Sequence, residues 1–182
     1  MRAIAMVAHP DDCVIFAYSF IHAHPELDWT VCYLTYTATD YRGSELKAFW
    51  DKRKIATKFL GYVDDWHDIE NKQISFDEAN AWIDIQEAVS GYNIVLTHDQ
   101  DGDYGHIHHK FVHAAVADYH PNMITFAGIG QGSDKYTVPH GVYSFDELPE
   151  HGNIVAGFHQ NEHVNEYTVP DNIKVMLELI NT

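Results

Sequence analysis

The sequence predicts a Rossmann-like, three-layer α/β domain in which helices cover both faces of a mostly parallel sheet. Short apolar runs rich in β-branched residues alternate with stretches of helical periodicity through residues 1–127. The helical stretches are long enough to serve as crossovers between parallel strands. The 182 residues, 46% of them hydrophobic, suffice for one domain with a buried core. We therefore expect a single domain over 1–182, with an α/β core at 1–127 and an irregular C-terminal part at 128–182.

The expected strands are apolar runs that end in turn-forming or polar residues. The run at the N-terminus stops at the sequence His-Pro-Asp-Asp, and the fourth run stops before the polar loop 98–105. We expect strands at Arg2–Ala8, Thr30–Thr37, Tyr62–Trp66, Tyr92–Thr97 and Met123–Ala127.

The expected helices follow these strands, and some of them carry recognisable ends. Ser44 is a typical N-cap and Gly61 a typical C-cap for the second helix, and Asp77 complements the dipole at the start of the third. After Gly128 the alternation gives way to a glycine-rich patch and short runs such as Gly141–Phe145. We expect helices at Asp12–Ala23, Ser44–Leu60, Phe76–Ser90 and His106–Tyr119, and a last one after Pro170-Asp171.

The charge balance argues against polyanionic partners. The chain has 27 acidic and 11 basic side chains, a formal net charge of −16, and the whole excess lies in residues 61–182. Because affinity for nucleic acids and anionic lipids comes from Lys and Arg, we expect neither nucleic acid nor membrane as a partner. The apolar stretch Cys13–Ile21 is too short for a membrane span and follows acidic residues, which favours a cytoplasmic protein. Cys13 and Cys32 are expected to be buried, reduced thiols.

Residues typical of metal ligands follow the first and the fourth expected strands. Ligands of open parallel sheets bind beyond the carboxyl ends of the strands, so two such loops can face each other. His9 and Asp12 are three residues apart across a turn, and His106 and His109 lie one helical turn apart, with His108 rotated away from both. Two ligands from the first loop and one from the second would give the two histidines and one aspartate of a catalytic zinc, with water in the fourth position.

Other polar residues near these segments remain as alternatives or helpers. Asp11 lies beside the ligand set and is left over as a base for bound water. His113 is a fallback ligand one turn after His109, and His98 ends the fourth expected strand near the site. Each segment alone has a plainer interpretation, either an aspartate-rich turn or a surface pair of histidines. Their conjunction at two strand ends favours a metal site.

The two segments together resemble a known pair of motifs. Ala8-His9-Pro10-Asp11-Asp12 and Tyr104-Gly105-His106-Ile107-His108-His109 are similar to the signatures of the PIG-L / LmbE-like family of zinc-dependent N-deacetylases, and the order of strands and helices over 1–127 is similar as well. The resemblance implies a zinc site at His9, Asp12 and His109, a general base at Asp11, a residue stabilising the transition state at His106, and a tyrosine facing the substrate carbonyl at Tyr104.

These roles describe the hydrolysis of an acetamide to acetate and a free amine. Zinc is a Lewis acid for the amide oxygen and lowers the pKa of its water towards ~7. Asp11 would take the proton and deliver it to the leaving amine, while a protonated His106 and the Tyr104 hydroxyl would face the charge that develops on the oxygen. A set of two histidines and one aspartate also suits Fe(II), Co(II) or Mn(II).

The sequence departs from the family pattern at several positions. Cys13 stands where glutamate is common, and Ile107-His108 replace the usual Pro-Asp. Lys52-Arg53-Lys54 occupy the region where the family has Arg-x-x-Glu. Because of these departures, the resemblance defines the residues that contact the substrate less well than it defines the metal ligands.

The implied function is removal of acetyl from an N-acetylated sugar or conjugate of the N-acetylglucosamine type. We expect Arg42 to contact a sugar or phosphate, and Asp99 and Asp103 to bond substrate hydroxyls; the alternatives are a surface arginine and turn-forming acids. An acidic pocket favours a soluble small molecule over a phosphatidylinositol-linked substrate. The other readings are an amidase of a thiol conjugate and a noncatalytic metal- or sugar-binding protein, against which the presence of Asp11 speaks. An oligomer is compatible with each of them.

Overall fold

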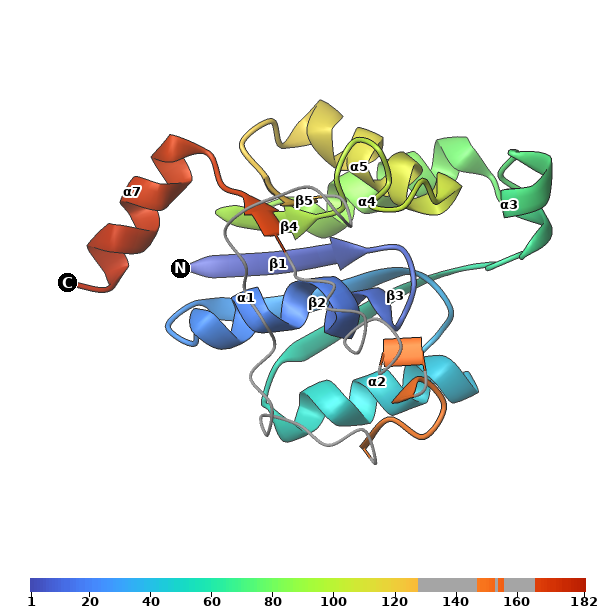
Figure 1. Ribbon diagram of the computed structural model, residues 1–182, viewed down its shortest axis with the longest axis horizontal. Helices are drawn as coiled ribbons and strands as arrows, with labels where there is room; N and C mark the ends of the chain where they lie inside the picture. The colour runs from blue at the N-terminus through green and yellow to red at the C-terminus, as the bar shows by residue number, and fades with distance from the viewer. Residues whose placement is uncertain (128–146, 153, 156–165) are drawn as a thin grey trace.

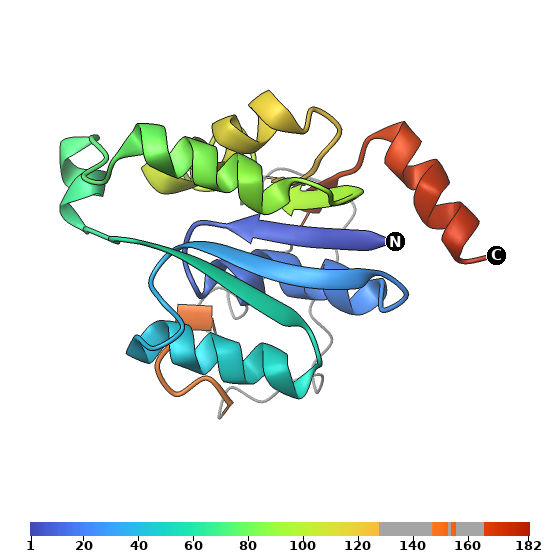
Figure 2. The same cartoon turned by 180° about the vertical axis from the view of Figure 1, so that it is seen from behind.

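The computed structural model describes residues 1–127, 147–152, 154–155 and 166–182. Within these residues the sheet has the order β3-β2-β1-β4-β5-β6, and all neighbouring strands are parallel except the antiparallel pair β5 and β6. Helices cover both faces (Figure 1 and Figure 2), which confirms the predicted fold class. The strands are β1 (Arg2–Val7), β2 (Asp28–Thr35), β3 (Ala56–Tyr62), β4 (Ile94–Thr97), β5 (Ile124–Ala127) and β6 (Glu166–Thr168).

Two layers of helices pack on the two faces of the sheet. Successive side chains of a strand point to opposite faces, so Ala5 of β1 lies in one core and Met6 in the other. The first core includes η1, a π-helix at Cys13–Ala17, with α1 (Tyr18–Ala23), α2 (Tyr41–Lys52) and α7 (Asp171–Ile180). The second includes α4 (Glu78–Val89) and α5 (Ile107–Tyr119). The short α3 (His67–Asn71) follows β3.

The direction in which the sheet grows reverses between β1 and β4. From β1 the chain adds β2 and β3 on one side and then places β4 and β5 on the other. Met6 of β1 lies opposite Thr97 of β4, so the next residues of both strands leave the sheet at the same edge. This edge, to the right of β1 in Figure 1, is the position at which open α/β sheets bind their ligands.

The second expected helix begins earlier than predicted, at Tyr41 with Asp40 and not Ser44 as its N-cap, and is wrong over its C-terminal part. Helix α2 ends at Lys52, and β3 begins at Ala56 with its first residue opposite Thr30 of β2. Lys54 adopts the left-handed conformation (φ +59°) after the helix, a role the prediction gave to Gly61. Gly61 (φ +81°) instead lies in β3 near a shift in its register with β2. Pairing with β2 decides the state of this segment, which its helical spacing could not reveal.

The expected strand at Tyr62–Trp66 is wrong, because the chain leaves the sheet after Tyr62. The other expected elements lie within a few residues of their predicted bounds, and the structure adds two elements. Asp77 caps α4 by accepting a hydrogen bond from the backbone N–H of Asn80 (3.1 Å). Neither α3 nor β6 was predicted. The patch after Gly128 and the run Gly141–Phe145 lie outside the described residues. Cys13 and Cys32 are buried and unpaired, as expected. No helix in the described part of the chain is both long and apolar enough to cross a membrane.

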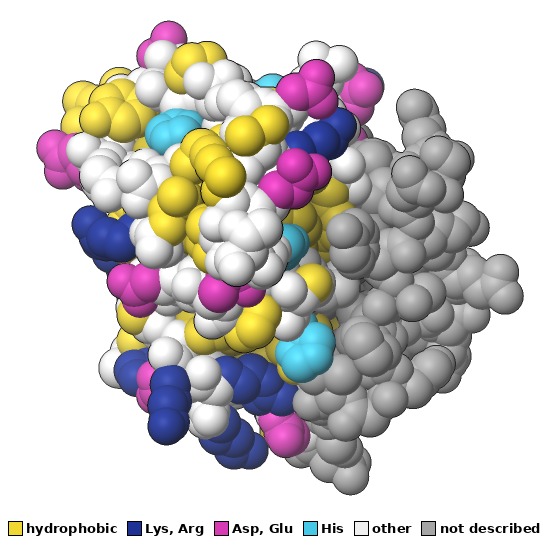
Figure 3. All heavy atoms as spheres, turned by 90° about the vertical axis from the view of Figure 1, so that its left-hand side faces the viewer, with side chains coloured by type: hydrophobic (Ala, Val, Ile, Leu, Met, Phe, Trp, Pro, Cys, Tyr) yellow, Lys and Arg dark blue, Asp and Glu magenta, His cyan; other side chains and the backbone are white. Residues whose placement is uncertain are grey.

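The surface at the opposite edge of the sheet is mixed in charge. Figure 3 shows this side, on which hydrophobic, acidic and basic side chains alternate and the Lys and Arg side chains gather towards the lower edge. Seven of the eleven basic residues belong to residues 1–60. The net negative charge is therefore not distributed evenly over the surface.

Candidate active site

The loops that follow β1 and β4 are bonded to each other at the carboxyl edge of the sheet. The backbone N–H of Ala8 donates a hydrogen bond to Nε2 of His98 (3.0 Å). The hydroxyl of Thr97 donates to the carbonyl oxygen of Met6 (2.8 Å). These buried bonds hold the two predicted ligand segments side by side.

The loop after β1 is a tight turn that brings His9 and Asp12 together. Oδ2 of Asp12 accepts a hydrogen bond from the backbone N–H of His9 (2.7 Å) and lies 3.1 Å from Nδ1 of the same histidine. Both residues are buried. The π-helix η1 begins directly after this turn, and such wide turns recur at functional sites because they redirect side chains.

The loop after β4 is wound by Asp99 and two glycines. Oδ1 of Asp99 accepts the backbone N–H groups of Asp101 (2.8 Å) and Asp103 (2.9 Å). Gly102 has φ +73°, and a Cβ there would lie 2.6 Å from the carbonyl oxygen of His106. Asp99 is thus the turn-forming acid of the plainer alternative, with one oxygen already used by the backbone, while the tight winding carries Asp103 beneath α5.

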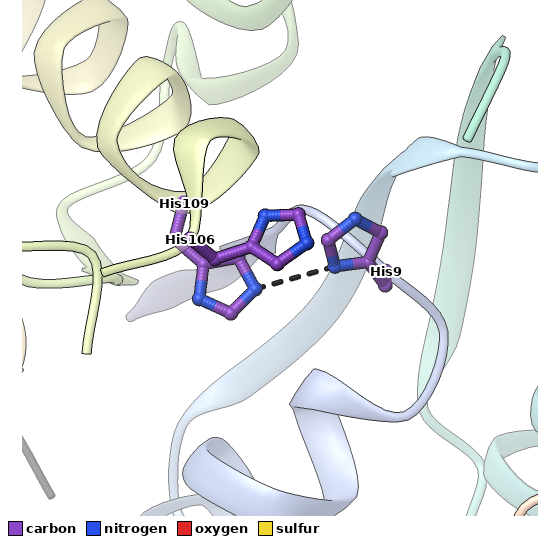
Figure 4. Close-up of side chains that lie close together, drawn as sticks. All are labelled: His9, His106 and His109. Carbon is purple, nitrogen blue, oxygen red and sulfur yellow. Dashed lines mark hydrogen bonds between the residues drawn. The ribbon is translucent and has the colours of Figure 1, made fainter. Parts of the chain in front are cut away.

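The three ligands implied by the resemblance lie at the corners of a small triangle. Nδ1 of His9 is 3.1 Å from Oδ2 of Asp12 and 3.2 Å from Nε2 of His109, and the last two atoms are 3.2 Å apart. Zinc with bonds of about 2.1 Å separates tetrahedral ligands by about 3.4 Å, so the triangle fits such an ion. Figure 4 shows His9, on the loop after β1, facing His109 of α5 and His106 at the N-cap of that helix. His113, the fallback ligand, contacts the His98 carbonyl instead (2.9 Å).

Other combinations of the same side chains also place ligand atoms within reach of one ion. Two of them keep His109 and differ in its partners, and a third lies on the other side of His9. The groups are His9 with His106 and His109, Asp12 with His98 and His109, and His9 with Asp64 and His108.

Asp103 contacts His109 at the ring nitrogen that does not belong to the ligand triangle. Its Oδ2 is 2.8 Å from Nδ1 of His109 and 2.5 Å from Nδ1 of His98. A carboxylate in this position accepts the Nδ1 proton of His109 and leaves the lone pair of Nε2 for an ion. With 6% of its surface exposed, Asp103 is too buried to bond substrate hydroxyls, which corrects its predicted role.

The charges of the buried cluster balance each other in the metal-free protein. Burial disfavours a charged His9, but Asp12 and Asp64 outweigh it and raise the pKa of His9 to about 10. Burial also opposes charge on His109, and Asp12 and Asp103 raise its pKa above the ordinary value. The same histidines hold the pKa of Asp12 well below its usual range, against its own burial. Positive charge on the histidines therefore compensates the carboxylates when no cation is bound.

Arg42 contacts the predicted general base and not an open surface. Its Nη2 lies 2.6 Å from Oδ1 of Asp11, and its Nη1 donates to the hydroxyl of Tyr36 (3.1 Å) and to Oδ2 of Asp64 (3.4 Å). The predicted contact with a sugar or phosphate is thus replaced by a fork that holds two carboxylates. Its effect is to fix the orientation of Asp11 beside the ligand triangle.

The Arg-x-x-Glu pattern is present ten residues before the place where the sequence comparison put it. Arg42 and Glu45 both lie in the first turns of α2, and both contact His151. Nε of Arg42 donates to Nε2 of His151 (2.9 Å), while Glu45 is bonded to Nδ1 of the same ring. Lys52-Arg53-Lys54 are at the other end of α2 and lie away from the site.

His106 and Tyr104 border the ligand triangle, but His106 is neutral. Its Nδ1 accepts a hydrogen bond from the backbone N–H of His108 (3.2 Å) at the N-cap of α5. Burial and the neighbouring charges of His9 and His109 lower the pKa of His106 to about 3. The expectation of a protonated His106 is therefore wrong, and the ring presents Nε2–H as a neutral donor. Tyr104 is 53% exposed, with its ring 5.2 Å from that of His109.

Three further residues of the site were not predicted as part of it. His108 is fully buried, with Nδ1 3.0 Å from Nε2 of His9 and Nε2 2.8 Å from Oδ2 of Asp68. Oδ1 of Asp64 lies 3.4 Å from the same nitrogen of His9. The expectation that His108 turns away fails because His9 reaches the side of the first turn of α5. Asp64 follows the end of β3, so correct placement of that strand would have revealed it.

Comparison with known proteins shows that the chain shares its fold with deacetylases. A model of the PIG-L family, described as GlcNAc-PI de-N-acetylase, matches residues 4–120. A protein of Acanthamoeba polyphaga mimivirus, described as uncharacterized, is 23% identical over 193 residues, covering 94% of this chain and 81% of the relative.

Solved structures with the same fold include enzymes of two kinds. A deacetylase of teicoplanin biosynthesis covers 92% of this chain and 96% of its own at 16% identity and a TM-score of 0.58. The N,N'-diacetylchitobiose deacetylase of Pyrococcus horikoshii covers 98% and 76% at 16% identity and a TM-score of 0.54. A 4-carboxy-2-hydroxymuconate hydratase of Pseudomonas putida covers 88% and 83% at 12% identity and a TM-score of 0.61. At these identities the likeness is one of fold.

Proposed function

Because the chain belongs to the GlcNAc-PI de-N-acetylase (PIG-L) family, we propose that it is a metal-dependent hydrolase that removes acetyl from an N-acetylated sugar or sugar conjugate. One observation carries this proposal. Three ligand atoms from two loops converge within 3.2 Å, and Asp11 lies beside them without belonging to the triangle. A carboxylate that is not itself a ligand favours a catalytic protein over one that only binds metal.

The donor set fits a divalent transition metal. Two imidazole nitrogens and one carboxylate oxygen suit zinc and equally Fe(II), Co(II) or Mn(II), and His109 is oriented by Asp103 in the manner usual for a metal-bound histidine. His9, Asp12 and His109 would hold the ion. When bound, it would supply a Lewis acid for the acetamide oxygen and for the attacking water.

The surrounding side chains provide the proton transfers and the stabilisation of charge. Asp11, oriented by Arg42, takes a proton from the attacking water and delivers it to the leaving amine. His106 donates its Nε2–H towards the oxygen on which negative charge develops, since its Nδ1 is occupied by a backbone N–H. The Tyr104 hydroxyl is a second donor at the exposed side. Each donor is worth about 3–4 kcal/mol in a preorganised site.

A soluble N-acetylated sugar is the substrate class that the charges favour. Asp11 and Asp64 face the one guanidinium of Arg42, so little positive charge remains for a substrate phosphate. A neutral acetamide and a product amine suit this environment. The deacetylase of the same fold whose structure is known with an inhibitor acts, by its name, on N,N'-diacetylchitobiose, which makes that sugar a sensible first compound to test.

Acetate release from the metal-loaded protein tests the proposal. The compounds are N-acetylglucosamine, N,N'-diacetylchitobiose and glucosaminides with varied aglycones, with a thiol conjugate of N-acetylglucosamine in parallel. We expect acetate and a free amine in equal amounts from at least one N-acetylated sugar. Absence of acetate from every sugar, with the metal bound, would contradict the proposal in favour of an amidase of other conjugates or a binding protein.

The variant Asp11→Asn tests the assignment of the base. The amide keeps the shape of the side chain but cannot accept the proton, so we expect turnover to fall by about 10²–10⁴-fold with the metal content unchanged. Metal content is measured on the same preparation as acetate release. His22→Gln, an exposed substitution on α1, serves as the control. Turnover that survives in Asp11→Asn would remove Asp11 from this role.

A further inference from the structure

His9 lies between two sets of ligand atoms, one at each ring nitrogen. Nδ1 faces the triangle described above. On the opposite edge of the ring, Nε2 is 3.0 Å from Nδ1 of His108 and 3.4 Å from Oδ1 of Asp64, and these two atoms are 3.8 Å apart. The separations lie around the value of about 3.4 Å expected between tetrahedral ligands with bonds of about 2.1 Å. The second group therefore has the dimensions of a metal site of its own.

His108, like His109, has one ring nitrogen next to a buried carboxylate. Its Nε2 faces Oδ2 of Asp68 at 2.8 Å, just as Nδ1 of His109 faces Asp103. Asp68 is buried and fixed, because it also accepts hydrogen bonds from the backbone N–H (3.0 Å) and the hydroxyl (3.1 Å) of Ser75. A carboxylate that takes the proton of one ring nitrogen leaves the other nitrogen with a lone pair. The lone pair of His108 is at Nδ1, directed at His9 and Asp64.

The charge of the cluster favours more than one dication. Among the described residues, four carboxylates contact these histidines, and a fifth, that of Asp11, is joined to them through the guanidinium of Arg42. If the histidines are neutral, one dication leaves two negative charges without compensation in a largely buried site, which is costly. The carboxylates are Asp11, Asp12, Asp64, Asp68 and Asp103.

We propose that His9 Nε2, His108 Nδ1 and Asp64 Oδ1 form a second divalent-cation site, which shares His9 with the first. The second ion would take the place of the proton on Nε2 of His9, and that proton would be released to solvent. The site is weaker than the first, because the proton of a neutral imidazole is costly to remove and Arg42 lies on the other oxygen of Asp64. It fills as the metal concentration rises.

Filling of this site lowers the turnover of the first, a consequence that rests on the proposed function. A cation at Asp64 repels Arg42, whose other nitrogen orients Asp11. Excess metal is thus an inhibitor that acts through a site distinct from the catalytic triangle.

Metal binding to the metal-free protein tests the second site without reference to activity. Equilibrium dialysis against Zn(II) or Co(II) should give two equivalents in the wild type, the second more weakly held than the first. Asp64→Ala should keep the first equivalent and weaken the second at least tenfold. Asp65→Ala, which removes the same charge one residue away, should keep both. His108→Phe, which keeps the ring and removes both nitrogens, should also lose the second equivalent.

The outcomes separate the two proposals. A wild-type protein that takes up one equivalent even in a large excess of metal would show that His108 only accepts a hydrogen bond from His9, and the second site would be overturned. The same holds if Asp64→Ala and His108→Phe bind two equivalents as the wild type does. Retention of the first equivalent and an unchanged circular dichroism spectrum show that each variant is folded. Two equivalents without acetate release at either stoichiometry would refute the proposed function alone.

Discussion

The two adjacent histidines of α5 show how single contacts decide the chemistry of a residue. His109 is bonded to Asp103 through Nδ1, whereas His108 is bonded to Asp68 through Nε2. The free nitrogen of each ring then faces a different edge of His9. Because the anchoring carboxylate determines which nitrogen carries the lone pair, these aspartates matter to metal binding without touching the ion.

Asp103→Asn should weaken metal binding while leaving the ligands in place. The amide oxygen is neutral and is therefore a weaker acceptor for the Nδ1–H groups of His98 and His109, which share Oδ2 of the carboxylate, and its NH2 group would face the backbone N–H of Asp99. His109 is then held less firmly. We expect the affinity for Zn(II) to fall by about 10–100-fold, measured by competition with a chromophoric chelator. Asp101→Asn, an exposed substitution on the same loop, is the matched control. Equal affinities of the two variants would contradict the anchoring role.

Arg42→Lys should reduce turnover more than metal content. A lysine carries the charge but cannot span Asp11, Tyr36 and Asp64 with one planar fork. We expect kcat to fall by about tenfold or more, which corresponds to about 1.4 kcal/mol, with the metal content unchanged. Arg2→Lys, at the amino end of β1, is the control. A variant that loses its metal and regains activity at high metal concentration would show that Arg42 acts on the ligands instead.

At the scale of elements, the start of α2 depends on the absence of a side chain at Gly43. A Cβ there would lie 1.9 Å from the carbonyl oxygen of Thr37, far inside contact distance. This close approach of the two backbone segments places Arg42 and Glu45 next to the site. It is invisible in the sequence, where Gly43 is only an unfavourable residue for a helix.

Gly43→Ala should therefore destabilise the protein although alanine favours helices. The preference of a helix for alanine over glycine is about 1 kcal/mol, whereas overpacking costs about 1–3 kcal/mol and here involves backbone atoms that cannot move aside. We expect a net fall in Tm of several degrees by differential scanning calorimetry. Ser44→Ala, exposed in the same turn, should change Tm little. A higher Tm for Gly43→Ala would mean that the loop before α2 moves aside to accommodate the methyl group, which would contradict this prediction.

The elements were predictable where local patterns and tertiary pairing agree. β1, β4, α4 and α5 combine apolar periodicity with polar ends, and each lies close to its predicted bounds. The segment 56–62 fails because its spacing suits a helix, while its backbone pairs with β2 at the edge of the sheet. That single misplacement also concealed Asp64 and Asp68, since the rule that finds ligands at strand ends needs the right strand end.

At the scale of the whole molecule, the buried charges make stability depend on pH in the absence of metal. The pKa of His9 is about 10 in the folded protein against an ordinary value of 6.5. Between these values the folded state binds one proton more than the unfolded state, so the free energy of unfolding falls as the pH rises, by at most about 1.4 kcal/mol per pH unit. The stabilisation is complete below pH 6.5 and disappears as the pH passes the folded pKa.

Urea unfolding in the presence of a chelator, between about pH 7 and about pH 9, measures this slope. An ion at Nδ1 replaces the proton of His9. The free energy of unfolding of the metal-loaded protein should therefore not show this slope with pH. His9→Gln should reduce the slope, with a remainder from His109, and His22→Gln should retain it in full. A slope in His9→Gln equal to that of the wild type would assign the effect to another group.

The sequence by itself determined the fold class and the approximate place of the site. His9 and Asp12 share a turn, His106 and His109 share the start of a helix, and parallel strands bring both segments to one edge of the sheet. Only the tertiary structure decided which atoms face one another. His9 meets His108 across 99 positions, His108 meets Asp68 across 40, and Arg42 meets Asp11 across 31. Such contacts depend on where β3 ends and how α2 and α3 pack, which is set by long-range packing and not by local spacing.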